Sequence, residues 1–148
     1  RDGSVEKYYL ALVAGQWDQG ERKVTAPLRT NTLAGGERGV RVDDTGKAAL
    51  TVFRPIDRFR TATLVEAQLH TGRTHQIRVH GAHIGHPLAG DTKYGEREFN
   101  TTMRALGLRR MFLHAHRVVF VDQDNNPLDV SAPLADQLKA VLDGFESS

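Results

Sequence analysis

The densest group of side chains able to do chemistry lies between Thr71 and His80, in the order T-G-R-T-H-Q-I-R-V-H. Its two arginines carry planar forks of N–H donors that match carboxylates, phosphates and base edges. Its histidines and its glutamine add groups that donate or accept hydrogen bonds. A segment of this kind suits an anionic partner, which is either a carboxylate or the backbone and bases of a nucleic acid.

Helical spacing of about 100° per residue divides this segment into two polar surfaces. With residues 72–85 treated as a helix, Gln76, His80 and His83 fall together and Arg73 lies beside them. Arg78 lies on the other side, among small residues that would let another segment approach closely. Because an unpaired buried charge is very costly, we expect Arg78 to meet an anionic partner.

An ordinary amphipathic helix with a solvated polar face is the alternative interpretation, and composition alone favours it. Lys and Arg total 20 against 18 for Asp and Glu, which gives a formal charge of +2. So small an excess does not by itself indicate a nucleic-acid partner. The order of the residues in the 71–80 segment argues against the alternative more strongly than the charge does.

The remaining composition sets broad limits. A chain of 148 residues suits one domain or a large part of one, and 39% hydrophobic residues suffice for a packed core. The absence of cysteine excludes disulfides and thiolate metal sites and fits a reducing compartment, so we expect a cytoplasmic protein. The sequence has no apolar run of about 18 residues, so we expect no membrane association.

The elements that must position the 71–80 segment are mostly strands. Alternation, turn residues and helix-stop residues predict strands over 7–13, 24–28, 48–54, 61–69, 112–122 and 128–132, with helices over 72–85, 96–106 and 134–142. Pro133 should open the last helix, Pro55 should break the sheet pattern, and residues 30–42 should form a Gly-rich loop. Short turns between neighbouring strands predict an α+β fold with a mixed, mainly antiparallel sheet flanked by helices.

Four short motifs together resemble one family, the RluA-type RNA pseudouridine synthases. They are K-x-Y-x-A-L-V at 7–13, G-R-T-H-Q-I-R-V-H at 72–80, G-H-P-L-A-G-D-x-x-Y-G at 85–95 and F-L-H-A at 112–115. They occur in the family's order and span nearly the whole chain. The resemblance implies the pseudouridine synthase-like fold and an enzyme that detaches uracil from C1′ of a uridine in RNA, rotates it and rejoins it through C5.

The resemblance also implies roles for individual residues. Tyr9 would contact the target base, and Arg78 would pair with the catalytic aspartate. The remaining polar residues of the second motif would form structural and RNA-binding contacts; they are Arg73, His75, Gln76 and His80. The family uses no metal and no organic cofactor, so none is expected here.

The family's aspartate lies in a motif resembling H-R-L-D-x-x-T-S-G, about thirty residues before the tyrosine strand, and this motif does not occur in the 148 residues. Asp2 lacks its surroundings, and Asp91 fits a structural role better. The sequence begins without Met, directly before a strand. We therefore expect residues 1–148 to be the C-terminal part of a catalytic domain, inactive by themselves.

Two other functions remain open at this point. The first is a non-catalytic module that binds structured RNA through its arginines. The second is a metal-dependent hydrolase built on the closely spaced histidines, although none of them forms H-E-x-x-H. The expected partner is RNA, either rRNA or tRNA, and no obligate protein partner is evident from the sequence.

Overall fold

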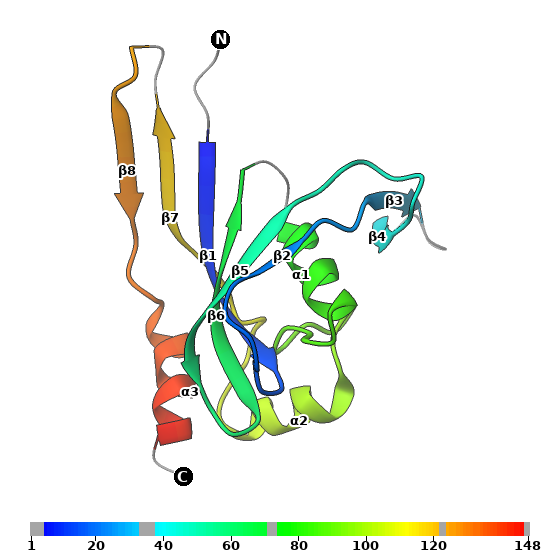
Figure 1. The fold of residues 1–148 in the computed structure, drawn as a ribbon. Coiled ribbons are helices and arrows are strands. Elements are labelled where there is room, and N and C mark those ends of the chain that lie inside the picture. The colour runs from blue at the N-terminus through cyan, green and yellow to red at the C-terminus, as the bar shows by residue number, and fades with distance from the viewer. Residues whose placement is uncertain (1–4, 33–37, 71–73, 122–123, 147–148) are drawn as a thin grey trace.

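A central antiparallel sheet organises the chain in the computed structural model, which describes residues 5–32, 38–70, 74–121 and 124–146 (Figure 1). Its strand order is β2-β5-β6-β1-β7-β8, with β3-β4 as a separate hairpin. The strands are β1 (Val5–Ala14), β2 (Arg22–Val24), β3 (Leu28–Thr32), β4 (Arg38–Val42), β5 (Thr51–Arg58), β6 (Ala62–Leu69), β7 (Leu113–Val121) and β8 (Pro127–Ser131). The helices are α1 (Thr74–His83), α2 (Arg97–Ala105) and α3 (Asp136–Glu146). The predicted α+β fold with a mainly antiparallel sheet is confirmed.

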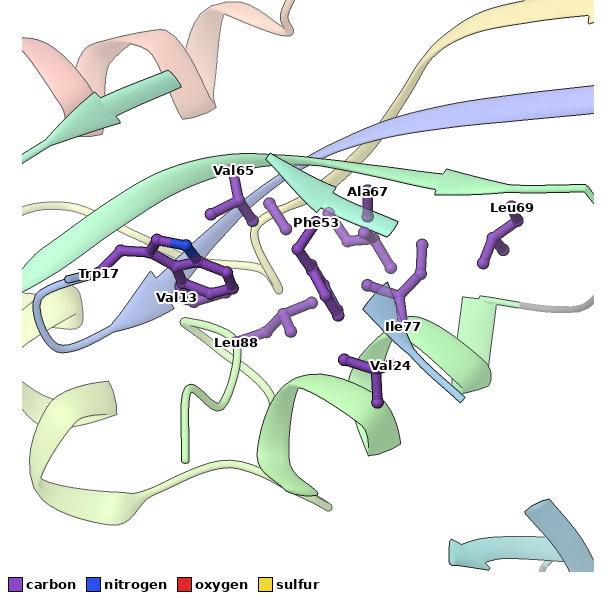
Figure 2. Close-up of a cluster of buried hydrophobic side chains, with 11 residues drawn as sticks. Val13, Trp17, Val24, Phe53, Val65, Ala67, Leu69, Ile77 and Leu88 are labelled. Atoms are coloured by element: carbon purple, nitrogen blue, oxygen red, sulfur yellow. The ribbon is translucent and has the colours of Figure 1, made fainter. Parts of the chain in front are cut away.

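Alternation along β1 divides the core into two layers, because successive strand side chains point to opposite faces. Ala11 and Val13 belong to a cluster that includes Ile77 of α1 and Leu88. Leu12 belongs to a second cluster that includes side chains of α2 and α3. Figure 2 shows the first cluster, where Phe53, Val65 and Ala67 of the sheet lie against Ile77 and Leu88. Helix α1 therefore lies on the sheet face toward which Tyr9, Ala11 and Val13 point.

The hairpin β3-β4 is where the predicted secondary structure was most wrong. The single strand expected at 24–28 is divided between β2 and β3, and the loop expected at 30–42 contains the end of β3 and all of β4. Residues 33–37, at the centre of that expected loop, lie outside the described residues. Polar and glycine residues did not prevent pairing, because a two-stranded hairpin can be held by backbone hydrogen bonds and by contacts with neighbouring elements.

Two prolines also behave differently from the prediction. Strand β5 continues through Pro55, with an irregular register between Pro55 and Asp57 that accommodates the missing N–H. Helix α3 begins at Asp136, so Pro133 lies outside its first turn. The predicted helices at 72–85 and 96–106 are confirmed as α1 and α2 over the described residues, with ends that differ by one or two residues.

Candidate active site

The loop that follows α1 is attached to the end of β1. Ala14 donates its N–H to the Pro87 carbonyl and Ala89 donates its N–H to the Leu12 carbonyl, each at 2.8 Å. Leu88 is fully buried between them and pairs with Val13. These contacts fix the backbone that leads into Asp91, so Asp91 is placed relative to the same strand that carries Tyr9.

Asp91 and Arg78 form a two-bond ion pair at the centre of this region. Arg78 Nε and Nη2 donate to the two carboxylate oxygens of Asp91, both at 2.9 Å. The Asp91 side chain is 1% exposed and that of Arg78 is 15% exposed. Oδ1 of Asp91 also accepts the backbone N–H groups of Lys93 and Tyr94 at 3.0 Å. The carboxylate is thus held by four hydrogen bonds from a side chain and a turn.

The ionised state of this pair follows from the same contacts. Burial alone would raise the pKa of the Asp91 carboxyl, but hydrogen bonds from Arg78, Tyr94 and Lys93 outweigh it and lower the pKa. The hydrogen bonds to Asp91 raise the pKa of the Arg78 guanidinium. Both groups therefore carry their charges throughout the neutral pH range.

This pairing differs from the expectation that Arg78 awaits a carboxylate from outside the chain. The residue expected to be merely structural, Asp91, already holds one edge of the guanidinium. A guanidinium has five N–H donors, and Asp91 engages only the Nε–Nη2 edge. The Nη1 group lies 3.4 Å from Nε2 of His75. Arg78 therefore keeps donors that a second carboxylate can share, in an orientation that Asp91 fixes.

Tyr9 lies on β1 between Ala67 of β6 and Ala115 of β7. It is partly buried and packs against the cluster that contains Ile77 of α1. Burial raises the pKa of its phenol. Its neighbour Tyr8 contacts Glu6 and Arg117 instead. The structure thus places Tyr9 on the sheet face that α1 covers, and the catalytic role of Tyr9 stays a prediction.

The four residues expected to contact RNA have different environments. Arg73 lies outside the described residues. His80 is fully buried, with Nδ1 2.7 Å from Thr51 Oγ1 and Nε2 2.8 Å from the Ala26 carbonyl. Gln76 is 8% exposed and donates to the Leu50 carbonyl. The polar atoms of His80 and Gln76 join α1 to neighbouring segments, which fits the structural part of their expected role, and their RNA contacts stay predictions.

His75 borders an open cavity of about 550 Å³ between the hairpin and the start of α1. The cavity is lined by Leu28, Arg29, Thr30, Val40, Thr45, Gly46, Lys47, Ala48, Ala49, His75 and Gln76. Its cationic side chains, Arg29 and Lys47, come from the hairpin and the turn that follows it. The RNA contact predicted for His75 stays a prediction, and its side chain borders a cavity that is open to solvent.

Sequence reasoning overlooked Tyr94, which lies beside both Arg78 and His75. The centre of its ring is 4.9 Å from Cζ of Arg78, and its hydroxyl is 3.2 Å from Nδ1 of His75. The signal was present in the motif at 85–95, where a tyrosine follows the aspartate by three residues. Only the turn around the Asp91 carboxylate brings that ring back toward α1.

The histidines do not assemble into a metal centre within the described ranges, where no group of three or more His, Asp or Glu side chains is placed to hold an ion. His80 and His86 instead contact backbone carbonyls. The expectation that no metal is used remains a prediction. Across the same ranges, no helix is long and apolar enough to cross a membrane.

We expect His80 to make the stability of the protein depend on pH. Burial is the main cause that lowers the pKa of its imidazole, so the folded state stays neutral where the unfolded state, with a pKa of about 6.5, takes up a proton. Stability should therefore fall as the pH drops below about 6.5. His80→Ala should cost about 2–4 kcal/mol at pH 8, from the lost packing and hydrogen bonds.

Urea unfolding at pH 8, 7, 6 and 5 measures this effect. The difference in free energy of unfolding between wild type and His80→Ala should shrink toward acid pH. Only the wild type loses stability through this imidazole, which takes up a proton on unfolding. A difference that stays constant from pH 8 to pH 5 would show that His80 does not titrate with unfolding.

Comparisons with known proteins show which family the chain resembles. The profile described as RNA pseudouridylate synthase matches residues 1–83. A ribosomal large subunit pseudouridine synthase C from Pasteurella multocida is 48% identical over 96% of this chain and 44% of its own length. The protein of the same name from Haemophilus influenzae is 47% identical over 98% of this chain and 45% of its own length. The chain therefore spans less than half the length of these relatives.

The fold has solved counterparts as well. Human RNA pseudouridylate synthase domain containing 1 superimposes with a TM-score of 0.73 at 23% identity, covering 97% of this chain and 66% of that one. At that identity the likeness concerns the fold alone. With a profile match over more than half of its residues and the four motifs in order, the chain belongs to the RNA pseudouridylate synthase family.

Proposed function

We propose that the whole protein isomerises uridines to pseudouridines in large-subunit ribosomal RNA. The observation that carries this proposal is the 42–48% identity, over nearly the whole chain, to proteins named ribosomal large subunit pseudouridine synthase C. The ion pair at Arg78 and the tyrosine at position 9 are consistent with it. The protein would work on RNA in the cytoplasm.

The proposed reaction breaks the N1–C1′ bond of uridine and forms a C5–C1′ bond, while N1 gains the proton that C5 loses. All atoms of the nucleotide are retained and no net oxidation occurs, so the chemistry requires no redox cofactor. A base stacked in RNA cannot reach a protein carboxylate, so the target nucleotide must be extruded. Tyr9 offers a flat ring on which the extruded uracil can stack.

Arg78 supplies a permanent cation for the catalytic carboxylate in this scheme, because a guanidinium stays protonated at any working pH. Asp91 holds the Nε–Nη2 edge, so the guanidinium plane is set before the second carboxylate arrives. A cation beside that carboxylate keeps it ionised. We infer that this second carboxylate comes from a part of the whole protein outside residues 1–148, because the relatives are more than twice the length that this chain matches. The 148 residues alone would then bind RNA without turnover.

Mapping pseudouridines in ribosomal RNA from cells that lack the whole gene tests the proposal. We expect one or a few large-subunit positions to lose pseudouridine and to regain it when the whole gene is restored. Expression of residues 1–148 alone in the same cells should not restore them. Unchanged pseudouridine at every position, together with RNA binding by the purified whole protein, would favour the non-catalytic RNA-binding module instead.

A further inference from the structure

Tyr94 touches three parts of the candidate site with one side chain. Its hydroxyl accepts the backbone N–H of Val40 in β4 at 3.0 Å and lies 3.2 Å from Nδ1 of His75 in α1. Its ring lies against the guanidinium of Arg78, at 4.9 Å from Cζ to the ring centre. Its own N–H is held by Asp91 at 3.0 Å. Tyr94 thus joins the hairpin, the start of α1 and the ion pair.

The contact with Val40 matters because β3 and β4 form a sheet of their own. Near its base the hairpin is tied by hydrogen bonds between Leu28 and Lys47 and by the Asp43 N–H, which donates to the Pro27 carbonyl. Val40 lies further out along β4, opposite Thr30. Its N–H donates to Tyr94, so the hydroxyl binds the hairpin at a point beyond its base. Both Val40 and His75 line the open cavity, so this contact lies at the wall of that cavity.

The ring contact acts on Arg78 from a different direction than Asp91 does. Asp91 holds one edge of the guanidinium through two hydrogen bonds, whereas the Tyr94 ring has the guanidinium carbon Cζ over its own face at 4.9 Å. A cation near an aromatic face is attracted by the negative charge density of the ring. The two contacts together define where the Nη1 group points.

We propose that Tyr94 is a positioning residue of this enzyme, whose hydroxyl holds the β3-β4 hairpin against α1 for RNA binding and whose ring orients Arg78 for catalysis. This proposal rests on the function proposed above. It separates the two halves of one side chain, so Tyr94→Phe and Tyr94→Leu should have different consequences. Phenylalanine keeps the ring and loses the hydroxyl, and leucine loses both.

Two measurements on the whole protein test the proposal without relying on activity. In Tyr94→Phe the Val40 amide should exchange with solvent about tenfold faster, which is the effect of losing one ordinary hydrogen bond. The Asp43 amide, at the base of the hairpin, should keep its rate. The Nε–H resonance of Arg78 should keep its ring-current shift in Tyr94→Phe and lose it in Tyr94→Leu.

Kinetics with the target RNA add the functional readout. Tyr94→Phe should raise KM for RNA with kcat within about twofold of wild type, whereas Tyr94→Leu should also lower kcat about tenfold, an effect between those of an exposed and a fully desolvated cation–π contact. Tyr8→Phe is the matched control, because it removes a hydroxyl that binds Glu6 away from the site, and both constants should stay unchanged.

An unchanged Val40 exchange rate in Tyr94→Phe would overturn the role of the hydroxyl. Equal kcat values, or equal Arg78 resonances, in the Phe and Leu variants would overturn the role of the ring. Should the wild-type protein form no pseudouridine, the proposed function would fail, and the exchange and resonance measurements would still decide whether Tyr94 positions these two groups.

Discussion

Arg78→Ala is expected to lower pseudouridine formation by the whole enzyme about a thousandfold, because it removes the cation proposed to hold the catalytic carboxylate, and one preorganised donor is commonly worth about 10²–10³ in kcat. The same change leaves the Asp91 carboxylate, 1% exposed, without its ion-pair partner. Removing one member of a buried pair destabilises a protein by about 3–5 kcal/mol. Activity and stability should therefore fall together in this variant.

A double variant separates the two effects. Arg78→Met combined with Asp91→Asn removes both charges, keeps most of the side-chain volume, and leaves an amide oxygen for the N–H groups of Lys93 and Tyr94. Because replacing a whole buried pair is often nearly neutral, we expect its stability to return to within about 2 kcal/mol of wild type. Its activity should remain as low as that of Arg78→Ala. Single-turnover assays and urea unfolding measure the two quantities.

Recovery of activity in the double variant would contradict the catalytic role of Arg78, because it would show that the single variant failed only through misfolding. Arg78→Lys is a further control. Lysine keeps the positive charge but not the fork that spans both oxygens of Asp91, so it should restore less than about a tenth of the activity.

Gly90→Ala is expected to destabilise the protein by about 3 kcal/mol or more, from two separate causes. Gly90 has φ +80°, a conformation that costs a residue with a side chain about 1–2 kcal/mol. A Cβ there would also lie 2.5 Å from the Arg110 carbonyl oxygen and 2.9 Å from Met111 Cα, both backbone atoms that cannot turn aside. The loop that leads into Asp91 would have to move away from the backbone of Arg110 and Met111.

Gly107→Ala provides the matched control, since Gly107 has φ +103° but no atom within 4 Å of an added Cβ. It should show only the cost of the backbone conformation, about 1–2 kcal/mol. Urea unfolding of both variants measures the difference. Equal losses of stability at the two positions would show that the close approach to Arg110 adds no cost. That result would contradict tight packing between Gly90 and the backbone of Arg110 and Met111.

Local sequence patterns predicted the central part of this fold well. The K-Y-Y-L-A-L-V run has the residues of a strand buried on both faces, and it forms the middle of β1. The hairpin was mispredicted because its pairing depends on contacts that no local pattern contains, such as the Tyr94 hydroxyl that accepts the Val40 N–H. Its strand residues are largely polar or glycine, so alternation gave no signal.

Prediction of the site followed the same division. The small neighbours of Arg78 on the helix indicated that it needs an anionic partner, and Asp91 is that partner in the structure. The sequence did not indicate Asp91, because the two residues lie thirteen positions apart in the chain, with a turn between them. The hydrogen-bond partners of Gln76 and His80 could not be predicted for a related reason. Helical spacing correctly placed the two side chains on the same face of the helix. Only tertiary packing shows that this face meets Thr51, whose hydroxyl contacts both of them.

The hydrogen bonds between residues 87–89 and the end of β1 mean that Tyr9 and the segment leading to Asp91 are both attached to one strand. Ala89 is fastened opposite Leu12, three strand residues from Tyr9, a span of about 10 Å at 3.3–3.4 Å per residue. Movement of the surrounding loops therefore leaves that span unchanged. A residue added between Ala89 and Asp91 would therefore displace the carboxylate relative to the strand that carries Tyr9.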